Sequence, residues 1–584
     1  MTKTNSNDGP TRDVRPRSER PLRVGLISLG CAKNLVDAEV MLGSLLQHGM
    51  EITNDAAQAD AVIVNTCSFI DAAQEESVDA ILESVALREA NRRGQAVIVS
   101  GCLPQRFRGE LPQLLPEVDA FMGIDQVTRV GQIVEDALQN RRNRMGKQPT
   151  SQSEFRPAKA KITGRIAVLE KNRAAEERVR PAETGFPHLT QPATRNTSAA
   201  SVPILEVTPR PAFVPDFATP RFRLTPRHFA YVKIAEGCNH PCSFCIIPRM
   251  RGPHRSRRQA DIVAEVRALL ADGVREINLI SQDSTYYGLD LRRPAAGISS
   301  PQEASHPSRA ISSPEKFSAT VESLPANAAT LCTLLRDLNS LPGDFWIRLL
   351  YTHPAHWTDE LIQTIAGCSK VARYVDIPLQ HIHENMLERM RRETSQQYLV
   401  DLLRRIRAGV PGIALRTTFI VGFPGETEQS FATLLDFIRE TKFERLGVFA
   451  YSREAGTRAG AMAGQISERV KQKRRELAMA EQRRIARKVS ESFVGRDIKV
   501  LVEGPADAKQ GTPANVSSWE HGWLRRPAAR APRTTAGRCF IARGEADAPD
   551  IDGRVFVRGR LPVGEFARVK IVGHTDYDLL AEPV

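Results

Sequence analysis

Three cysteines within eight residues are the part of this sequence best suited to chemistry: Cys238, Cys242 and Cys245. Three closely spaced thiolates can bind three irons of a cubane iron–sulfur cluster, and no fourth cysteine follows nearby. Ferredoxin-type cysteine runs take the missing ligand from the chain and form closed electron carriers. The spacing therefore predicts a cluster with one open iron, which can bind a reactant.

A zinc site is the alternative reading of the same residues. Zinc in a structural site takes four ligands in a tetrahedral arrangement, and His240 is the nearest candidate for the fourth. His240 lies inside the short loop between Cys238 and Cys242, where it would strain that geometry. The pattern favours iron and sulfide over zinc.

A second set of cysteines, Cys31, Cys67 and Cys102, lies near the N-terminus at intervals of 36 and 35 residues. Each follows a short apolar run, and each interval has the length of one strand–helix unit. Because the carboxyl ends of parallel strands meet at one edge of a sheet, where ligands bind, these thiols are expected to converge. They predict a second open cluster, and three buried apolar cysteines are the alternative. We interpret the isolated Cys332, Cys368 and Cys539 as incidental thiols.

The elements that position these cysteines form an α/β multidomain chain. After a tail at 1–20, predicted to be disordered, residues 21–145 alternate buried strands with helices. This alternation predicts an N-terminal open parallel α/β sheet. Residues 226–490 contain six strand candidates with helix-length spacers, which favour a central partial β/α barrel. Residues 491–584 contain short alternating strands typical of a small C-terminal β-barrel. Three low-complexity segments interrupt the pattern, a linker predicted to be largely disordered at 146–225 and insertions at 292–328 and 503–538.

Composition limits the possible classes of protein. The sequence has no run of eighteen apolar residues, so we expect no transmembrane helix, and the polar N-terminus lacks the apolar centre of a signal peptide. Nine cysteines in 584 residues do not form a disulfide framework. We therefore expect a cytoplasmic protein. The formal charge of +13 is weak support for nucleic-acid binding, and an RNA- or ribosome-associated partner stays open.

The C-x3-C-x2-C pattern after a barrel strand resembles the radical S-adenosylmethionine (SAM) signature. With three strand-end cysteines before it and a β-module behind it, the chain is similar to the methylthiotransferases. That resemblance implies that Cys238, Cys242 and Cys245 ligate a catalytic 4Fe–4S cluster. SAM would bind the open iron and be cleaved to a 5′-deoxyadenosyl radical.

The resemblance also assigns the other modules. Cys31, Cys67 and Cys102 would hold an auxiliary 4Fe–4S cluster that carries the sulfur to be transferred, and a second SAM would supply the methyl group. The central region would be the radical SAM core, and the C-terminal barrel would be a TRAM-like module.

Polar residues at the predicted strand ends are expected to contact SAM or substrate, with ordinary barrel-mouth polarity as the alternative. They are Gln282, Asp283, Arg348, Tyr351, Gln380, His381 and Arg416. Arg348 and Arg416 are further expected to hold a substrate carboxylate, from charge complementarity.

Residues 28–37, 238–252 and 546–553 resemble the branch of that family that modifies a ribosomal protein. This branch methylthiolates the β-carbon of an aspartate in small-subunit protein twelve, at the decoding centre. Residues 540–584 carry six Lys or Arg against eight Asp or Glu, whereas a module that grips RNA should be basic.

The partners implied are that ribosomal protein or the 30S particle, a flavodoxin- or ferredoxin-like electron donor, and a sulfur donor, with no membrane. Two other functions stay open, a tRNA adenosine methylthiotransferase and a non-catalytic iron–sulfur redox or regulatory protein.

Overall fold

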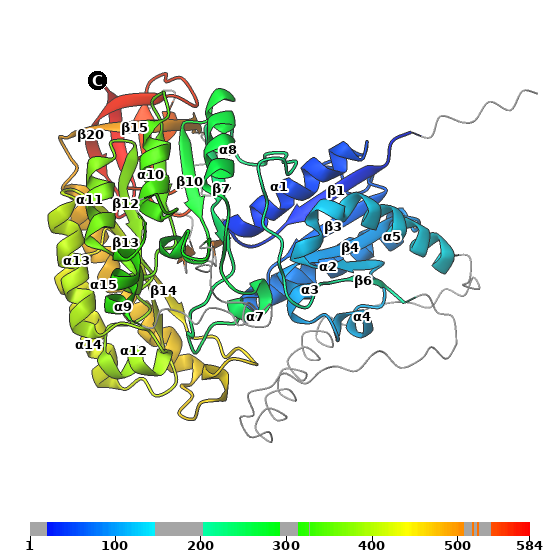
Figure 1. Cartoon of the computed structure of the whole chain (residues 1–584), viewed down its shortest axis with the longest axis horizontal. Coiled ribbons are helices and arrows are strands. Elements are labelled where there is room, and N and C mark those ends of the chain that lie inside the picture. Colours follow the sequence, from blue (N-terminus) through cyan, green and yellow to red (C-terminus); the bar gives the residue numbers. More distant parts are fainter. Residues whose placement is uncertain are drawn as a thin grey trace, which may run out of the picture.

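The computed structural model describes residues 20–145, 202–291, 313–325, 327–506, 517–518, 523–524 and 539–584. These residues form two six-stranded sheets, a closed five-stranded barrel and two short two-stranded pairs, in the order predicted (Figure 1). Residues 1–19, and most of the three low-complexity segments, lie outside the described residues. Within the described ranges, no helix combines the length and the apolar character that crossing a membrane requires.

The N-terminal sheet is parallel throughout, with the strand order β2-β1-β3-β4-β5-β6. All residues of β3 and β4 are buried, because helices cover both faces of the sheet. Its elements are β1 (Arg23–Ser28), α1 (Ala32–Gln47), β2 (Glu51–Ile52), β3 (Ala61–Thr66), α2 (Asp71–Asn91), β4 (Ala96–Gly101), α3 (Cys102–Arg106), α4 (Leu111–Leu114), β5 (Ala120–Met122), η1 (Ile124–Arg129), α5 (Val130–Met145) and β6 (Ile204–Glu206).

The end of the predicted linker is ordered, which corrects the sequence-based expectation for residues 202–225. Strand β6 extends the sheet by pairing in parallel with β5. Farther on, the Arg221 guanidinium binds Glu39 on α1 at 2.5 Å and Glu265 of the central domain at 2.5 Å. A three-residue strand is too short to produce a periodic signal, and the ion pairs depend on residues far away in the sequence.

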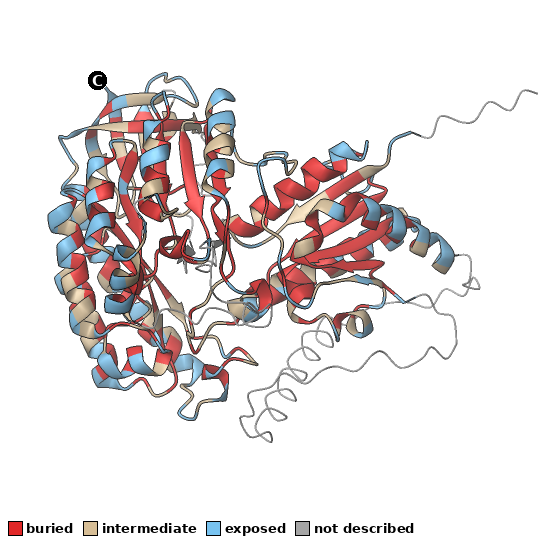
Figure 2. Cartoon of the chain, viewed as in Figure 1, coloured by how far each residue is buried: buried red, intermediate tan, exposed pale blue. Residues whose placement is uncertain are grey.

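The central sheet is also parallel, in the order β14-β13-β12-β11-β10-β7, and it stays open between β7 and β14. The partial barrel is thus confirmed. Helices lie along its outer side, and buried residues follow the strands (Figures 1 and 2). The strands are β7 (Phe229–Lys233), β10 (Glu276–Ile280), β11 (Trp346–Leu349), β12 (Val371–Asp376), β13 (Ala414–Val421) and β14 (Arg445–Ala450). The helices are α8 (Gln259–Ala271), α10 (Leu331–Ser340), α11 (Asp359–Gly367), α12 (Glu384–Met390), α13 (Gln396–Gly409), α14 (Glu428–Thr441) and α15 (Glu468–Glu491).

A further helix, α9 (Pro314–Glu322), lies inside the segment predicted as a surface insertion. Ser313 caps the helix by accepting a hydrogen bond from the Lys316 amide, and Pro314 occupies its first turn. Phe317 is buried and stacks on His356 with ring centroids 4.2 Å apart. One cap and one apolar anchor are enough to order this helix against the central domain.

The C-terminal domain is a closed barrel in the order β15-β18-β19-β21-β20. Its strands are β15 (Asp497–Pro505), β18 (Cys539–Gly544), β19 (Val555–Arg558), β20 (Phe566–His574) and β21 (Leu579–Pro583). Alternating residues of these strands form its core: Val500, Val502, Ala542, Val555, Val557, Val569, Ile571, Leu579 and Ala581. The predicted small β-barrel is confirmed.

The three domains meet inside the partial barrel. One buried apolar cluster contains Val36 from α1, Tyr231 from β7, Tyr374 from β12 and Ala548 from the loop between β18 and β19. Figure 2 shows α1 buried along most of its length. Helix α1 and the 545–553 loop therefore close the concave side of the open sheet, and α1 brings its N-terminal residue Cys31 to the domain boundary.

Candidate active site

The loop with Cys238, Cys242 and Cys245 follows β7 and the short strand β8 (Ala235–Glu236), which pairs with β9 (Arg255–Ser256). The Cys238 amide donates to the Gly252 carbonyl at 3.1 Å, and the Cys245 amide donates to the Cys242 carbonyl at 3.2 Å. Gly237 has φ +83, and a Cβ there would lie 2.0 Å from the Pro253 carbonyl oxygen. Only glycine allows this close return of the chain, which folds the cysteine loop into a compact turn.

The three thiols of this loop lie close enough for their charges to interact. Burial and the neighbouring charges of Cys245 and Cys242 hold the pKa of Cys238 well above its usual value. Burial and the Cys242 charge raise the pKa of Cys245 to about 12. Because Cys238 and Cys245 resist deprotonation by themselves, this loop suits a group that supplies positive charge among its sulfurs, as irons do. This donor set fits a cluster bound by three thiolates.

His240 does not complete a zinc site in this arrangement. Its Nδ1 is 2.6 Å from Glu393 Oε2, and its Nε2 is 2.9 Å from Asp283 Oδ2. These two carboxylates overcome the effect of burial and raise the pKa of His240 to about 9. Both ring nitrogens are therefore engaged as hydrogen-bond donors, away from a metal.

His240, His353 and His356 bring ring nitrogens within 4.8 Å of one another, a spacing that could suit a metal ion. The rings of His240 and His353, however, are stacked at 3.6 Å with an interplanar angle of 17°. Because imidazole binds a metal in its ring plane, two stacked rings cannot share one ion. We interpret the cluster as packing and hydrogen bonding that hold the cysteine loop.

The second cysteine set lies where predicted, at the carboxyl ends of β1, β3 and β4. Cys31 precedes α1, Cys67 follows β3, and Cys102 begins α3. Gly30 has φ +89, and a Cβ there would lie 2.8 Å from Cys67 Cβ and 3.3 Å from Cys67 Sγ. The loop that carries Cys31 thus passes directly against Cys67.

Buried polar side chains join the three strand ends. The Asn34 amide nitrogen donates to the Thr66 carbonyl at 2.8 Å, and the Asn65 amide nitrogen donates to the Asn34 carbonyl at 2.8 Å. The Thr66 hydroxyl donates to the Ser100 carbonyl at 2.6 Å. Cys102 Sγ lies 3.7 Å from Asn34 Oδ1. These bonds fix the positions of the loops that carry the thiols.

Replacement of Gly30 by alanine tests this convergence. We expect Gly30→Ala to lose iron at the N-terminal site, because the new Cβ would displace Cys67. Gly49→Ala is the matched control, since Gly49 has φ +75 and the Cβ that alanine would add there meets no atom within 4 Å. Both variants carry a left-handed backbone cost of about 1–2 kcal/mol. Iron content, measured in a Cys238→Ala/Cys242→Ala/Cys245→Ala background, should fall only for Gly30→Ala; equal iron in the two variants would contradict the convergence.

The segment that follows Cys245 packs against Cys102 of the N-terminal cysteine set at the domain boundary. Cys102, on α3, packs in one buried cluster with Ile246 and Met250, which directly follow the C-x3-C-x2-C loop. Met250 belongs to the short helix α7 (Ile247–Arg251), which contacts α3. The sequence placed each set in its own domain, and the structure brings the two together.

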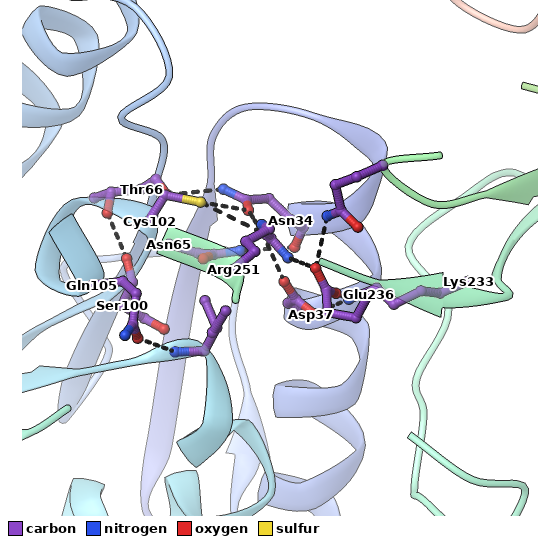
Figure 3. Close-up of polar contacts among 12 residues, drawn as sticks. Asn34, Asp37, Asn65, Thr66, Ser100, Cys102, Gln105, Lys233, Glu236 and Arg251 are labelled. Carbon is purple, nitrogen blue, oxygen red and sulfur yellow. Dashed lines mark hydrogen bonds and ion pairs between the residues drawn. The ribbon is translucent and has the colours of Figure 1, made fainter. Parts of the chain in front are cut away.

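Ion pairs reinforce this boundary (Figure 3). The Arg251 guanidinium donates to Asn34 Oδ1 at 2.5 Å and to Glu236 Oε1 at 2.9 Å. Lys233 Nζ lies 2.5 Å from Asp37 Oδ1 and 2.7 Å from Glu236 Oε2. Another pair joins Arg106 of α3 to Glu454, which follows β14, at 2.9 Å.

Arg348 and Arg416, expected from the sequence to hold a substrate carboxylate, form buried ion pairs within the protein. Arg348 is fully buried, and it donates to Glu276 at 2.6 Å and to the Glu545 carbonyl at 2.7 Å. Arg416 donates to Asp376 at 2.6 Å. These bonds help hold the domains together, while Arg348 Nη2 is buried without a hydrogen bond to any described residue, so a contact with a substrate carboxylate stays a prediction.

The remaining predicted contacts are likewise engaged within the protein. Gln282 donates to Glu236 Oε1 at 2.7 Å, and its own carbonyl oxygen is buried without a hydrogen bond. Asp283 accepts from His240 and from His356, the latter at 2.7 Å. Gln282 therefore keeps one acceptor that a ligand could use, whereas Asp283 serves the histidine cluster.

The other two strand-end positions show strained backbone. Tyr351 and Gln380 have φ values of 59 and 72, which are unusual for residues other than glycine. The Tyr351 ring lies under the Lys33 ammonium at 3.1 Å. His381 Nε2 lies 3.2 Å from Glu426 Oε1. Tyr351 thus lies at the boundary with the start of α1, which Cys31 precedes.

Sequence reasoning missed Arg251, Arg392 and the pair His353 and His356. Arg392 Nη1 donates to Cys242 Sγ at 3.3 Å, although the two residues are 150 positions apart. His353 and His356 follow β11 in a Thr-His-Pro-Ala-His run, and that strand-end placement was an available signal. Arg251 lies in the 238–252 run that resembles the family, but no pattern indicated its contacts with the N-terminal domain, and none indicated Arg392.

Models of three known families match the three domains. Residues 23–123 match the uncharacterized protein family UPF0004, residues 232–438 match the radical SAM superfamily, and residues 533–584 match the TRAM domain. The solved structure of the radical S-adenosylmethionine methyltransferase TsrM from Kitasatospora setae aligns over 76% of this chain and 77% of that chain, with 14% identity and a TM-score of 0.43.

Curated relatives match nearly the whole chain. The ribosomal protein uS12 methylthiotransferase RimO of Opitutus terrae is 48% identical over 565 residues, covering 96% of this chain and 97% of that relative. The protein of the same name from Akkermansia muciniphila is 43% identical over 564 residues, covering 96% of this chain and 100% of that relative. With both cysteine sets in place and all three domains matched, this chain belongs to the RimO family of radical SAM methylthiotransferases.

Proposed function

We propose that this chain methylthiolates the β-carbon of an aspartate in ribosomal protein uS12, with SAM as radical source and methyl donor. The main support is the presence of two three-cysteine sets whose domains meet where Cys102 packs against Ile246 and Met250. The names of the relatives support the choice of substrate. The enzyme uses two 4Fe–4S clusters and SAM, as its family does.

The residues take separate roles in this proposal. Cys238, Cys242 and Cys245 hold the radical SAM cluster, and Cys31, Cys67 and Cys102 hold the auxiliary one. When bound, these groups and SAM supply a carbon-centred radical, the sulfur and the methyl group. The chain itself supplies position, because α1 and the 545–553 loop close the concave side of the barrel and exclude water from it.

The proposed partners follow from this chemistry. Free uS12 or the assembled 30S particle would present the aspartate, and a flavodoxin- or ferredoxin-like protein would supply electrons. A separate sulfur donor would restore the auxiliary cluster after each turnover. A ribosomal substrate would place the enzyme in the cytoplasm.

The substrate is tested by anaerobic reconstitution with iron, sulfide, a reductant and SAM. We expect uS12 to gain one methylthio group by mass spectrometry, and uS12 with the target aspartate changed to asparagine to remain unmodified. Bulk tRNA serves as the competing substrate. Modification of tRNA but not of uS12 would favour a tRNA enzyme. Failure to cleave SAM to 5′-deoxyadenosine would favour a non-catalytic iron–sulfur protein.

A further inference from the structure

Arg251 connects the two cysteine sets directly. It is the last residue of α7, the helix that follows Cys245, and its guanidinium reaches into the N-terminal domain (Figure 3). Its Nη2 lies 3.5 Å from Cys102 Sγ with hydrogen-bond geometry, and also 2.5 Å from Asn34 Oδ1. Arg251 thus follows the central cysteine set in the sequence and contacts a sulfur of the N-terminal set.

The surroundings of Arg251 hold it in this position. The side chain is 2% exposed, and it forms ion pairs with Glu236 at 2.9 Å and with Asp37 at 3.2 Å. Lys233 binds the same two carboxylates, so two cations and two anions balance inside the boundary. A cluster with three thiolate ligands would add negative charge beside this balanced group. Arg251 is the cation that the structure places against Cys102 Sγ.

We propose that Arg251 tunes the auxiliary cluster, as a hydrogen-bond donor and fixed positive charge at the Cys102 sulfur. Hydrogen bonds to cluster sulfurs and local charge are main determinants of iron–sulfur potentials, and outer residues of a metal site orient its ligands. Because added positive charge favours the reduced form, Arg251 raises the reduction potential of this cluster. The inference rests on the proposed placement of that cluster at Cys31, Cys67 and Cys102.

Arg221 provides a matched control. Its guanidinium is also largely buried and also bridges the two domains, with Glu39 on one side and Glu265 on the other, each at 2.5 Å. It also donates to the Tyr231 carbonyl at 2.7 Å. Loss of Arg221 therefore weakens the domain boundary through oxygen partners, without removing the donor to Cys102.

The test uses the full chain with Cys238→Ala/Cys242→Ala/Cys245→Ala, so that all bound iron reports on the N-terminal site. Redox titration followed by electron paramagnetic resonance gives the midpoint potential of the cluster. We expect Arg251→Met to shift the midpoint to more negative values, Arg251→Lys to shift it less, and Arg221→Met to leave it unchanged. In the chain with all nine cysteines, Arg251→Met should lose about 10–100-fold in methylthio transfer while SAM cleavage continues.

Two results would overturn the inference. One is an unchanged midpoint in Arg251→Met, or in Arg251→Lys if the methionine variant does not bind iron. The other is an equal shift in Arg221→Met, which would attribute the effect to domain packing. If the Cys238→Ala/Cys242→Ala/Cys245→Ala chain binds no iron, that result would instead contradict the proposed cluster site at Cys31, Cys67 and Cys102.

Discussion

Replacing Cys31, Cys67 and Cys102 together by alanine is expected to remove about half of the bound iron and all methylthio transfer, with SAM cleavage retained. SAM cleavage should continue because the two cysteine sets lie in two separate domains. The 238–245 loop is held by bonds of its own domain, among them Ser243 to the Met390 carbonyl at 3.0 Å. Iron and sulfide analysis, together with 5′-deoxyadenosine assays under anaerobic conditions, measures the outcome.

The chain offers its own control for this experiment. Cys332 and Cys368 are buried in the core of the central domain, and Cys539 lies on β18. The variant Cys332→Ala/Cys368→Ala/Cys539→Ala should keep its full iron content and its activity. The reciprocal variant at Cys238, Cys242 and Cys245 should keep the other half of the iron but lose SAM cleavage. Loss of SAM cleavage from the N-terminal variant would contradict separate sites.

The largest effect on stability is expected at Glu276, the first residue of β10. Its carboxylate is fully buried between Arg348 at 2.6 Å and Arg543 of the C-terminal barrel at 2.5 Å. Removal of the charge in Glu276→Gln would leave two buried guanidinium groups without their shared partner, at a cost of about 3–5 kcal/mol. Denaturant unfolding should show a lower midpoint, and limited proteolysis should release the C-terminal domain more rapidly.

Arg275 is the neighbouring control, because its pair with Glu565 joins the same two domains at 2.9 Å but is partly exposed. Exposed ion pairs contribute about 0–1 kcal/mol, so Arg275→Ala should leave both measurements nearly unchanged. If Glu276→Gln and Arg275→Ala destabilise the protein equally, burial of the Glu276 charge does not explain the loss of stability.

The interface between the central domain and the C-terminal barrel should weaken at low pH. Burial would raise the pKa of Glu503, but Arg543 and His228 lower it to about 2. The pKa of Glu276 is likewise lowered, by Arg348 and Arg543 against the effect of burial. A carboxylate whose pKa is lowered by folding stabilises the folded state at pH values above its pKa in the unfolded chain, about 4.3 for Glu. This contribution to the free energy of unfolding is lost as the pH falls toward 2. Release of the C-terminal domain should therefore accelerate below about pH 4.3.

Local signals in the sequence were sufficient for the elements that carry the cysteines. Buried strands followed by helices place Cys67 after β3 and Cys102 at the start of α3, and glycines mark the turns beside them. Such signals depend on residues within one strand–helix unit. Strand β6 and helix α9 were missed, because a three-residue strand, or a nine-residue helix within a Pro/Ser/Ala-rich stretch, carries too little periodicity.

Sequence alone was enough to identify the two cysteine sets, the α/β domains that present them and the family resemblance. The packing of the domains determined which charged residues form ion pairs with one another. Arg348 and Arg416 were expected from the sequence to contact SAM or a substrate carboxylate, and in the folded chain they pair with Glu276 and Asp376. Arg251 meets Asn34 across 217 positions of sequence. A charge in the sequence does not identify its partner, since the pairing follows from which groups the folded domains bury together and must neutralise.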